Sequence, residues 1–244
     1  MSRKFDGTDD MINCTQVDPF NAASRLTAMA WIKQDSQVGG DRIVNYWGAT
    51  LDVDTSWIFS IAAGAAGADE LISGVNDCVT NLARISTSLN ANLVVSKWNH
   101  VCMSWNSGGN LDIYSNFLRL STASNIVENP ASSQVQSLTN LLIGKGNTVG
   151  DTFTGSIKDV QLFKNVALTK NEIFQSAYYP GSIRRGIRCE YPLWGDAVVE
   201  PDIGNANSVI PALHGVVTGT TYNKDNPPTN GYGVIKSPGM FSSF

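Results

Sequence analysis

The chain has 244 residues, of which 42% are hydrophobic and 16% are charged, and its formal net charge is −4. This hydrophobic content is enough for a full core and excludes a disordered chain, and the length fits one large domain. The longest basic cluster is Arg184, Arg185 and Arg188, which argues against a nucleic-acid binder because phosphate neutralisation needs many clustered cations. Every apolar run is shorter than the roughly 20 residues that a membrane-spanning helix needs.

Strand-like segments recur along the chain with turn signals between them. Leu26–Ile32 is apolar on both faces, which is typical of a strand buried between two layers. In Trp98–Trp105 the apolar side chains alternate, and a glycine-containing turn leads into Leu111–Tyr114, which predicts a hairpin. Further strands are predicted at Arg42–Trp47, Trp57–Ile61, Leu141–Ile143 and Ile157–Phe163.

One short helix is predicted near residues 169–178. Thr169 followed by Glu172 forms a capping-box pattern, in which each side chain accepts a hydrogen bond from the backbone of the other. The Pro-Gly pair at 180–181 ends the helical pattern. One short helix among many strands favours an all-β fold, a sandwich of two antiparallel sheets.

The composition changes after about Arg188, and six of the nine prolines follow that point. The same segment contains large apolar side chains, including Tyr191 and Trp194, that need burial. We therefore expect residues 1–188 to form the main body of the sandwich. Residues 189–244 are expected to add a further strand and a docking arm to the same domain.

Two tryptophans flank a pair of carboxylates between predicted strands. Trp47 and Trp57 lie on either side of Asp52 and Asp54, and alternate side chains of an extended strand point to one side roughly 7 Å apart. We interpret all four as candidate ligand-binding residues, with the tryptophans as a surface pair that stacks on a sugar. The two carboxylates also fit the spacing of an inverting glycosidase, although a polar loop before Trp57 is the simpler interpretation.

Other catalytic patterns are weak in this sequence. It contains two histidines, and we interpret His100 as structural and His214 as a surface residue. It has no G-x-S-x-G motif for a nucleophilic serine, so a non-enzymatic protein is expected.

Three segments together resemble the laminin-G-like jelly roll of the concanavalin A-like lectin/glucanase superfamily. They are Phe5–Ile12, which resembles the family's F-D-G-x-x-D-x-(apolar) opening strand, the Trp98–Trp105 strand with its Leu111–Tyr114 partner, and Phe153–Phe163 leading into the capping box. The resemblance covers about residues 5–180 and implies a two-sheet antiparallel jelly roll. Segments of 190–219 resemble the strand with which family members usually begin, which implies a circular permutation.

The resemblance also implies a metal and a role. Laminin-G-like domains often bind Ca²⁺ through loop carboxylates, for which Asp52 and Asp54 are the candidates and Asp69, Asp196 and Asp202 are further loop acids. Tyr191–Asp196 is similar to a segment of small jelly-roll proteins of tailed phages. This similarity implies a virion structural or accessory protein that decorates a head or tail by surface contacts with capsid or tail proteins and with itself.

Such a protein is made in the host cytoplasm, and the N-terminal residues show no pattern of a secretory signal peptide. The alternative is a carbohydrate-binding adhesin for host or mucus glycans. A glycoside hydrolase is a weaker alternative, because the superfamily's E-x-D-x-(x)-E strand is missing from the sequence.

Overall fold

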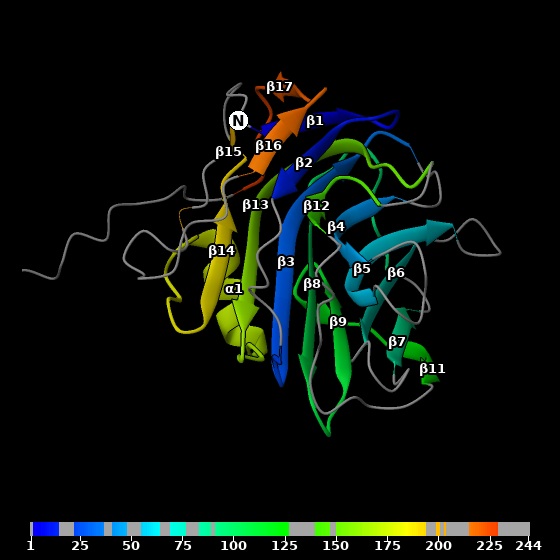
Figure 1. Cartoon of the computed structure of the whole chain (residues 1–244), viewed down its shortest axis with the longest axis vertical. Helices are drawn as coiled ribbons and strands as arrows, with labels where there is room; N and C mark the ends of the chain where they lie inside the picture. The colour runs from blue at the N-terminus through cyan, green and yellow to red at the C-terminus, as the bar shows by residue number, and fades with distance from the viewer. Residues whose placement is uncertain are drawn as a thin grey trace, which may run out of the picture.

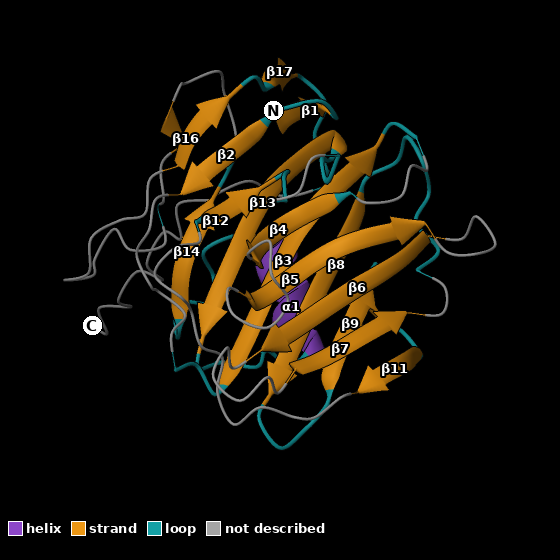
Figure 2. Cartoon of the chain, turned by 45° about the vertical axis from the view of Figure 1, so that its right-hand side comes forward, coloured by secondary structure: helices purple, strands orange, loops and turns teal. Residues whose placement is uncertain are grey.

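A computed structural model describes twelve stretches of the chain. They are residues 2–14, 22–36, 41–47, 55–63, 69–76, 83–88, 91–126, 140–146, 150–193, 199–200, 203 and 215–228. Within them the chain forms two antiparallel sheets that pack face to face, with one short helix outside (Figures 1 and 2). This arrangement confirms the predicted all-β sandwich.

The two sheets are called sheet I and sheet II. Sheet I has the strand order β10 (Leu118–Arg119), β9 (Leu111–Ser115), β8 (Asn99–Asn106), β3 (Arg25–Gln34), β13 (Thr154–Lys164), β1 (Ser2–Asp6) and β17 (Thr221–Asn223), with β14 (Ile187–Tyr191) also paired to β13. Sheet II has the order β11 (Thr122–Ile126), β7 (Ala83–Ser88), β6 (Asp69–Asn76), β5 (Thr55–Ala63), β4 (Arg42–Trp47), β12 (Leu141–Ile143), β2 (Met11–Cys14), β16 (Gly215–Thr218) and β15 (Val199–Glu200).

The core lies between the sheets, and the strand period of two decides which side chains reach it. In β8, Val101, Met103 and Trp105 are buried in the inter-sheet core, as their alternation predicts. In β3, Leu26 and its alternate neighbours enter the same core, whereas Met29 belongs to a second cluster on the outer face of sheet I. Burial of both faces explains why apolar side chains occur on both sides of the middle of this strand.

Helix α1 (Lys170–Tyr178) covers that outer face. Its capping box forms as predicted, because the Thr169 backbone N–H donates to Glu172 Oε2 at 2.9 Å and the Glu172 N–H donates to Thr169 Oγ1 at 3.5 Å. Ile173 and Leu168 are buried against Met29 in the second cluster. The helix is too short and too polar to cross a membrane.

The opening segment differs from the expected single strand over Phe5–Ile12. It forms β1 in sheet I and β2 in sheet II, joined by a turn at residues 7–10. Gly7 adopts φ +81°, a left-handed conformation that glycine reaches without strain, and this reverses the chain between the two layers.

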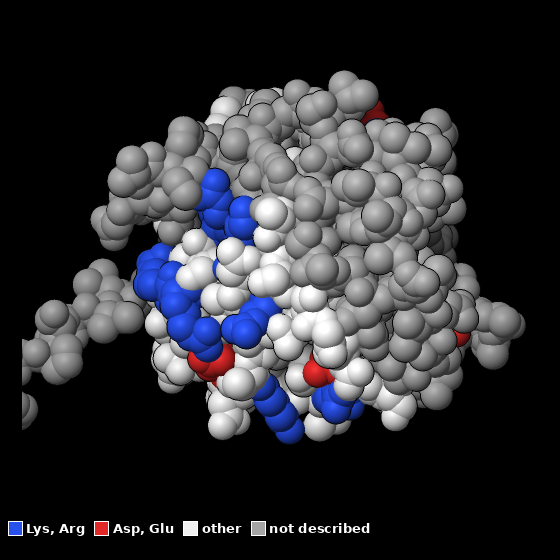
Figure 3. Space-filling view, turned by 60° about the horizontal axis from the view of Figure 1, so that its bottom comes forward, with Lys and Arg blue, Asp and Glu red and all other residues white. Residues whose placement is uncertain are grey.

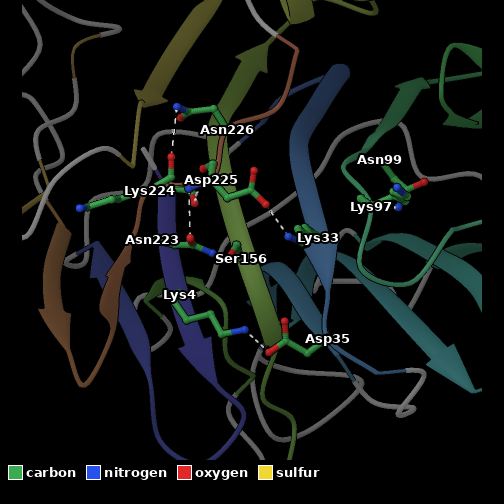
Figure 4. A network of polar contacts seen from close by, with 11 residues as sticks. Lys4, Lys33, Asp35, Lys97, Asn99, Ser156, Asn223, Lys224, Asp225 and Asn226 are labelled. Carbon is green, nitrogen blue, oxygen red and sulfur yellow. Dashed lines mark hydrogen bonds and ion pairs between the residues drawn. The ribbon is translucent and has the colours of Figure 1, made fainter.

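Segments beyond residue 188 pair with the body of the sandwich. Val160 in β13 pairs with Tyr191 in β14, β16 pairs with β2, and β17 pairs with β1. Side chains reinforce the β17 end, where Lys33 forms an ion pair with Asp225 and the Asn223 amide donates to Ser156 Oγ at 3.1 Å (Figure 4). The expected docking arm and the circular permutation stay predictions.

Candidate functional site

The hairpin of β4 and β5 carries the predicted ligand-binding residues. Trp47 is the last residue of β4 and pairs with Thr55, and the intervening Asp52 and Asp54 lie outside the described residues. Trp57 is fully buried and stacks on Tyr46, with ring centroids 6.4 Å apart. Its indole therefore has no free face for a sugar, in contrast to the expected surface pair.

The strand pattern gives the reason for the burial of Trp57. This residue shares the core-facing side of β5 with Phe59 and Ile61, and all three belong to the inter-sheet cluster. Of the two tryptophans, Trp47 alone stays a candidate for sugar stacking. Among the further loop acids, Asp69 is the first residue of β6, and Asp196 and Asp202 lie outside the described residues.

Three other carboxylates come together in the turn between β1 and β2. Asp6, Asp9 and Asp10 each place a carboxylate oxygen within 4.8 Å of the other two, and we call this group the acidic turn. Asp6 and Asp9 are exposed, whereas Asp10 is only 3% exposed. The D-x-x-D-D spacing of this group was a visible signal in the sequence, but its resemblance to a family strand did not predict a site there.

Local hydrogen bonds set the shape of the acidic turn. The Thr8 N–H donates to Asp6 Oδ1 at 2.7 Å, and the Asp6 N–H donates to Asp10 Oδ2 at 2.6 Å. The Thr152 hydroxyl donates to the Gly7 carbonyl and ties the turn to the residues before β13. The carboxylates are therefore held together by backbone contacts.

The turn between β16 and β17 closes over the buried carboxylate. Gly219 has φ +75°, and a Cβ atom at this position would lie 1.9 Å from Asp10 Oδ1. A side chain cannot be placed there without moving Asp10, so glycine is required on both conformational and steric grounds. The C-terminal strands thus help to build the acidic turn.

The pKa of Asp10 is raised above its usual value. Burial is the main cause, and the neighbouring negative charges of Asp6 and Asp9 add to it, against the lowering effect of the Asp6 backbone N–H. A bound cation would offset this repulsion, and clustered carboxylate oxygens are the donor type that hard cations such as Ca²⁺ prefer. The residues present therefore fit a divalent cation.

Next to the acidic turn, β2 and β16 place a strip of mixed polar and apolar side chains on the outer face of sheet II. Ile12 and Cys14 face the core, so Met11 and Asn13 point to the outer face, where their partners on β16 are Thr218 and Val216. Val216 is 51% exposed, and the buried Asn13 amide oxygen accepts no hydrogen bond from the described part of the chain. The exposed Val216 side chain offers an apolar surface for a sugar ring, whereas the Asn13 oxygen is buried and not accessible to a ligand.

Comparisons with known proteins give one family and several similar structures. Residues 6–174 match the Laminin_G_3 family model, which describes the concanavalin A-like lectin/glucanases superfamily. No curated protein matches the sequence.

Three solved structures show the extent of the likeness. A Bacteroides ovatus protein, described as carbohydrate-binding, has a TM-score of 0.63 and 17% identity over 90% of this chain and 58% of its own. The heptameric SAP-like pentraxin of Limulus polyphemus has a TM-score of 0.54 and 20% identity, covering 88% of this chain and 94% of its own. The Ruminococcus gnavus IT-sialidase CBM40 bound to α2,3-sialyllactose has a TM-score of 0.50 and 15% identity, covering 64% of this chain and 84% of its own. At these identities the likeness is one of fold.

Proposed function

The chain belongs to the concanavalin A-like lectin/glucanase superfamily, and from this premise we propose that it is a carbohydrate-binding protein. The observation that carries the proposal is the superfamily match over residues 6–174, on a chain that folds as the corresponding sandwich. Two of the similar structures support it, one described as a carbohydrate-binding protein and one bound to sialyllactose. These comparisons favour the glycan-binding alternative over the predicted virion role, which they do not support.

We place the sugar site at the acidic turn and the adjoining strip of β2 and β16. Asp6, Asp9 and Asp10 would hold a divalent cation, which when bound supplies positive charge and coordination positions for sugar hydroxyls. Val216, which is 51% exposed, covers an apolar face of the sugar ring.

The test measures glycan binding by wild-type protein on an array with Ca²⁺ and with EDTA. Asp9→Asn changes an exposed carboxylate of the acidic turn, and we expect it to weaken binding in Ca²⁺ about tenfold, or about 1.4 kcal/mol. Asp112→Asn is the control, because Asp112 lies in β9 and pairs with Arg119. Wild-type protein that binds no glycan with or without Ca²⁺ contradicts the proposal.

A second variant separates sugar contact from cation binding. Val216→Ala shortens the exposed apolar side chain but leaves all three carboxylates. We expect it to weaken glycan binding while it keeps the increase in melting temperature that Ca²⁺ gives to wild-type protein. Loss of both responses would show that Val216 is needed for the fold of the turn and would remove it from the sugar site.

We further propose that the protein is not an enzyme. Incubation with polysaccharides is expected to release no reducing sugar. Release that disappears in Asp52→Ala would overturn this proposal and favour the glycosidase interpretation. The virion role stays a prediction, and stoichiometric copy number in purified particles is its test.

A further inference from the structure

Three aromatic rings form a cluster on the outer face of sheet I, where α1 meets the turn between β9 and β10. Phe117 belongs to that turn, and Phe174 and Tyr178 belong to α1. The ring centroid of Phe117 lies 5.1 Å from that of Phe174 and 5.4 Å from that of Tyr178. The centroids of the two helix residues are 4.8 Å apart. We call these three residues the aromatic cluster.

The inner side of the aromatic cluster is fixed to the sandwich. The Phe117 ring stacks on the buried His100 ring, with centroids 4.8 Å apart. Trp31 contacts both Phe117 and Tyr178 edge-on, at centroid distances of 6.1 and 5.9 Å. The Trp31 indole N–H also donates to the Ala177 carbonyl of α1 at 3.2 Å. The rings are therefore positioned before any ligand arrives, which lowers the entropic cost of binding one.

The outer side of the aromatic cluster is open to solvent. The Phe174 side chain is 50% exposed, and those of Phe117 and Tyr178 are partly exposed. Asn171, Phe174 and Tyr178 follow the i, i+3, i+7 spacing of one helix face, so the exposed Asn171 lies on the same side of α1 as the rings. Apolar rings beside an uncharged amide suit a sugar, whose C–H face packs on a ring while a hydroxyl meets the amide.

The turn that carries Phe117 has an unfavourable backbone conformation. Ser115 in β9 pairs with Leu118 in β10, and the two residues between them form the hairpin loop. These residues, Asn116 and Phe117, have φ +46° and +68°. Glycine is favoured at the second position of such a loop, because a side chain disfavours positive φ. The strain places an aromatic ring at the surface where glycine would place none, and strain of this kind is often found at binding sites.

The size and shape of the aromatic cluster indicate what it can bind. An aromatic side chain has roughly 200 Å² of surface, so three rings that are at most half exposed offer about 300 Å². A stable protein–protein interface needs about 800 Å² from each partner. The ring planes meet at 66°, 33° and 45°, so the three rings cannot lie flat on one crystalline surface. One or two sugar rings of a single chain fit both observations.

We propose that the aromatic cluster is a second sugar site, which binds a single neutral polysaccharide chain of β-linked pyranose rings. Equatorial hydroxyls leave the faces of such a ring with exposed C–H groups. One of these faces packs on Phe174 while a hydroxyl contacts the Asn171 amide. The choice of a sugar as the ligand rests on the proposed carbohydrate-binding function. The site itself does not depend on the acidic turn and needs no cation.

The test titrates wild-type protein with cellohexaose and with xylohexaose, two soluble neutral β-linked chains, by calorimetry in EDTA. The chelator removes any cation-dependent binding at the acidic turn. We expect saturable binding of at least one of the two chains. Microcrystalline cellulose is expected to retain little protein, because the rings are not coplanar. Binding of neither soluble chain, or retention by the crystalline surface alone, would overturn the proposal.

Heparin is the probe for an electrostatic alternative. Figure 3 shows a group of Lys and Arg side chains on one face of the molecule, on which few acidic side chains appear. Adhesion of a polyanion to such a face weakens steeply as salt rises. We expect the affinity for the neutral chain to change less than about twofold between about 50 and 200 mM salt, because no ion is released. An affinity for the neutral chain that falls with salt as that for heparin does would contradict stacking on the rings.

Phe174→Leu is the decisive variant, because it keeps an apolar side chain on α1 but removes the exposed ring. We expect it to bind the oligosaccharide about tenfold more weakly, whereas Phe174→Tyr keeps the ring and should bind like wild-type protein. Tyr179→Leu is the matched control. Tyr179 caps the same helix and is 53% exposed, but its ring pairs with no other ring in the described part of the chain. Equal losses in Phe174→Leu and Tyr179→Leu would remove the cluster from the binding site.

Asp9→Asn separates this site from the one at the acidic turn. We expect it to leave oligosaccharide binding in EDTA unchanged, because Asp9 lies in the turn between β1 and β2. Binding that is lost in Asp9→Asn but kept in Phe174→Leu would overturn the second site and support the first. Wild-type protein that binds no glycan under any condition would contradict the proposed function as well.

Discussion

At the scale of single residues, His100 links burial to acid sensitivity. Its ring is buried between Trp31 and Phe117, with centroid distances of 5.2 and 4.8 Å, and burial lowers its pKa from 6.5 to about 3. The unfolded chain therefore takes up a proton at a higher pH than the folded protein does. The free energy of unfolding must fall as pH drops from 6.5 toward 3, by about 2 kcal/mol between pH 7 and pH 5.

Urea unfolding at pH 7 and pH 5 measures this dependence. His100→Leu keeps an apolar side chain of similar size and cannot titrate, and the Nδ1 atom that it removes makes no hydrogen bond within the described residues. We expect the variant to lose most of the difference between the two pH values, whatever its absolute stability. Wild-type protein with equal stability at both pH values would contradict the burial argument.

Burial also shifts the pKa of Asp10, but upward, because Asp10 is an acid. Its raised pKa means that the folded protein holds the carboxyl proton more tightly than the unfolded chain does, so ionisation at neutral pH costs stability. Asp10→Asn keeps an acceptor for the Asp6 N–H and removes the charge. Without divalent cations we expect this variant to have a higher melting temperature than wild-type protein. Addition of Ca²⁺ should no longer raise the melting temperature of the variant. A lower melting temperature in EDTA would contradict the repulsion argument.

At the scale of elements, the helix depends on its first turn. Thr169→Ala removes the hydroxyl that accepts from the Glu172 N–H, and a lost N-cap of this type costs about 1 kcal/mol. Because α1 covers the outer face of sheet I, this loss should appear as a lower urea midpoint of the whole domain. Thr169→Ser retains the hydroxyl and is the control, and an equal loss in both variants would contradict the capping role.

The strands and turns also show which features of the structure could be predicted from the sequence. Alternation predicted the faces of β8 correctly, and the same rule applied to Trp57 and Phe59 would have placed Trp57 in the core. The reversal at Gly7 was harder to predict, because a strand signature runs through it and the turn forms only when β1 and β2 join different sheets. The acidic turn follows from that reversal, since its carboxylates are close neighbours in the sequence. Gly219 lies against Asp10 only because strands that are distant in the sequence pair with each other. Local sequence patterns do not encode that pairing.

At the scale of the whole molecule, the two ends of the chain depend on each other. β17 pairs with β1 and β16 pairs with β2, so the last described strands border the first strands in both sheets. The Ser2 hydroxyl also donates to the Asp225 carbonyl at 3.1 Å, and Lys33 lowers the pKa of the Asp225 carboxyl. Exposed ion pairs of this kind contribute at most about 1 kcal/mol, so strand pairing is the larger contribution.

Truncation after His214 tests this dependence. It removes β16 and β17, leaves the inner strands β1 and β2 as edges, and takes away Gly219 from the acidic turn. Each lost ladder hydrogen bond costs about 0.5–1.5 kcal/mol, so the loss is comparable with the 5–15 kcal/mol stability of a typical domain. We expect the truncated chain to lose cooperative urea unfolding and to aggregate through its new edges.

Truncation after Pro228 is the matched control, because it keeps every strand that the structure describes. It should unfold at a urea midpoint close to that of the full chain and keep glycan binding in Ca²⁺. A chain ending at His214 that unfolds like the control would show that β1 and β2 are stable as edges. The closing strands would then be needed for the acidic turn alone, and the loss would appear in Ca²⁺ and glycan binding but not in the urea midpoint.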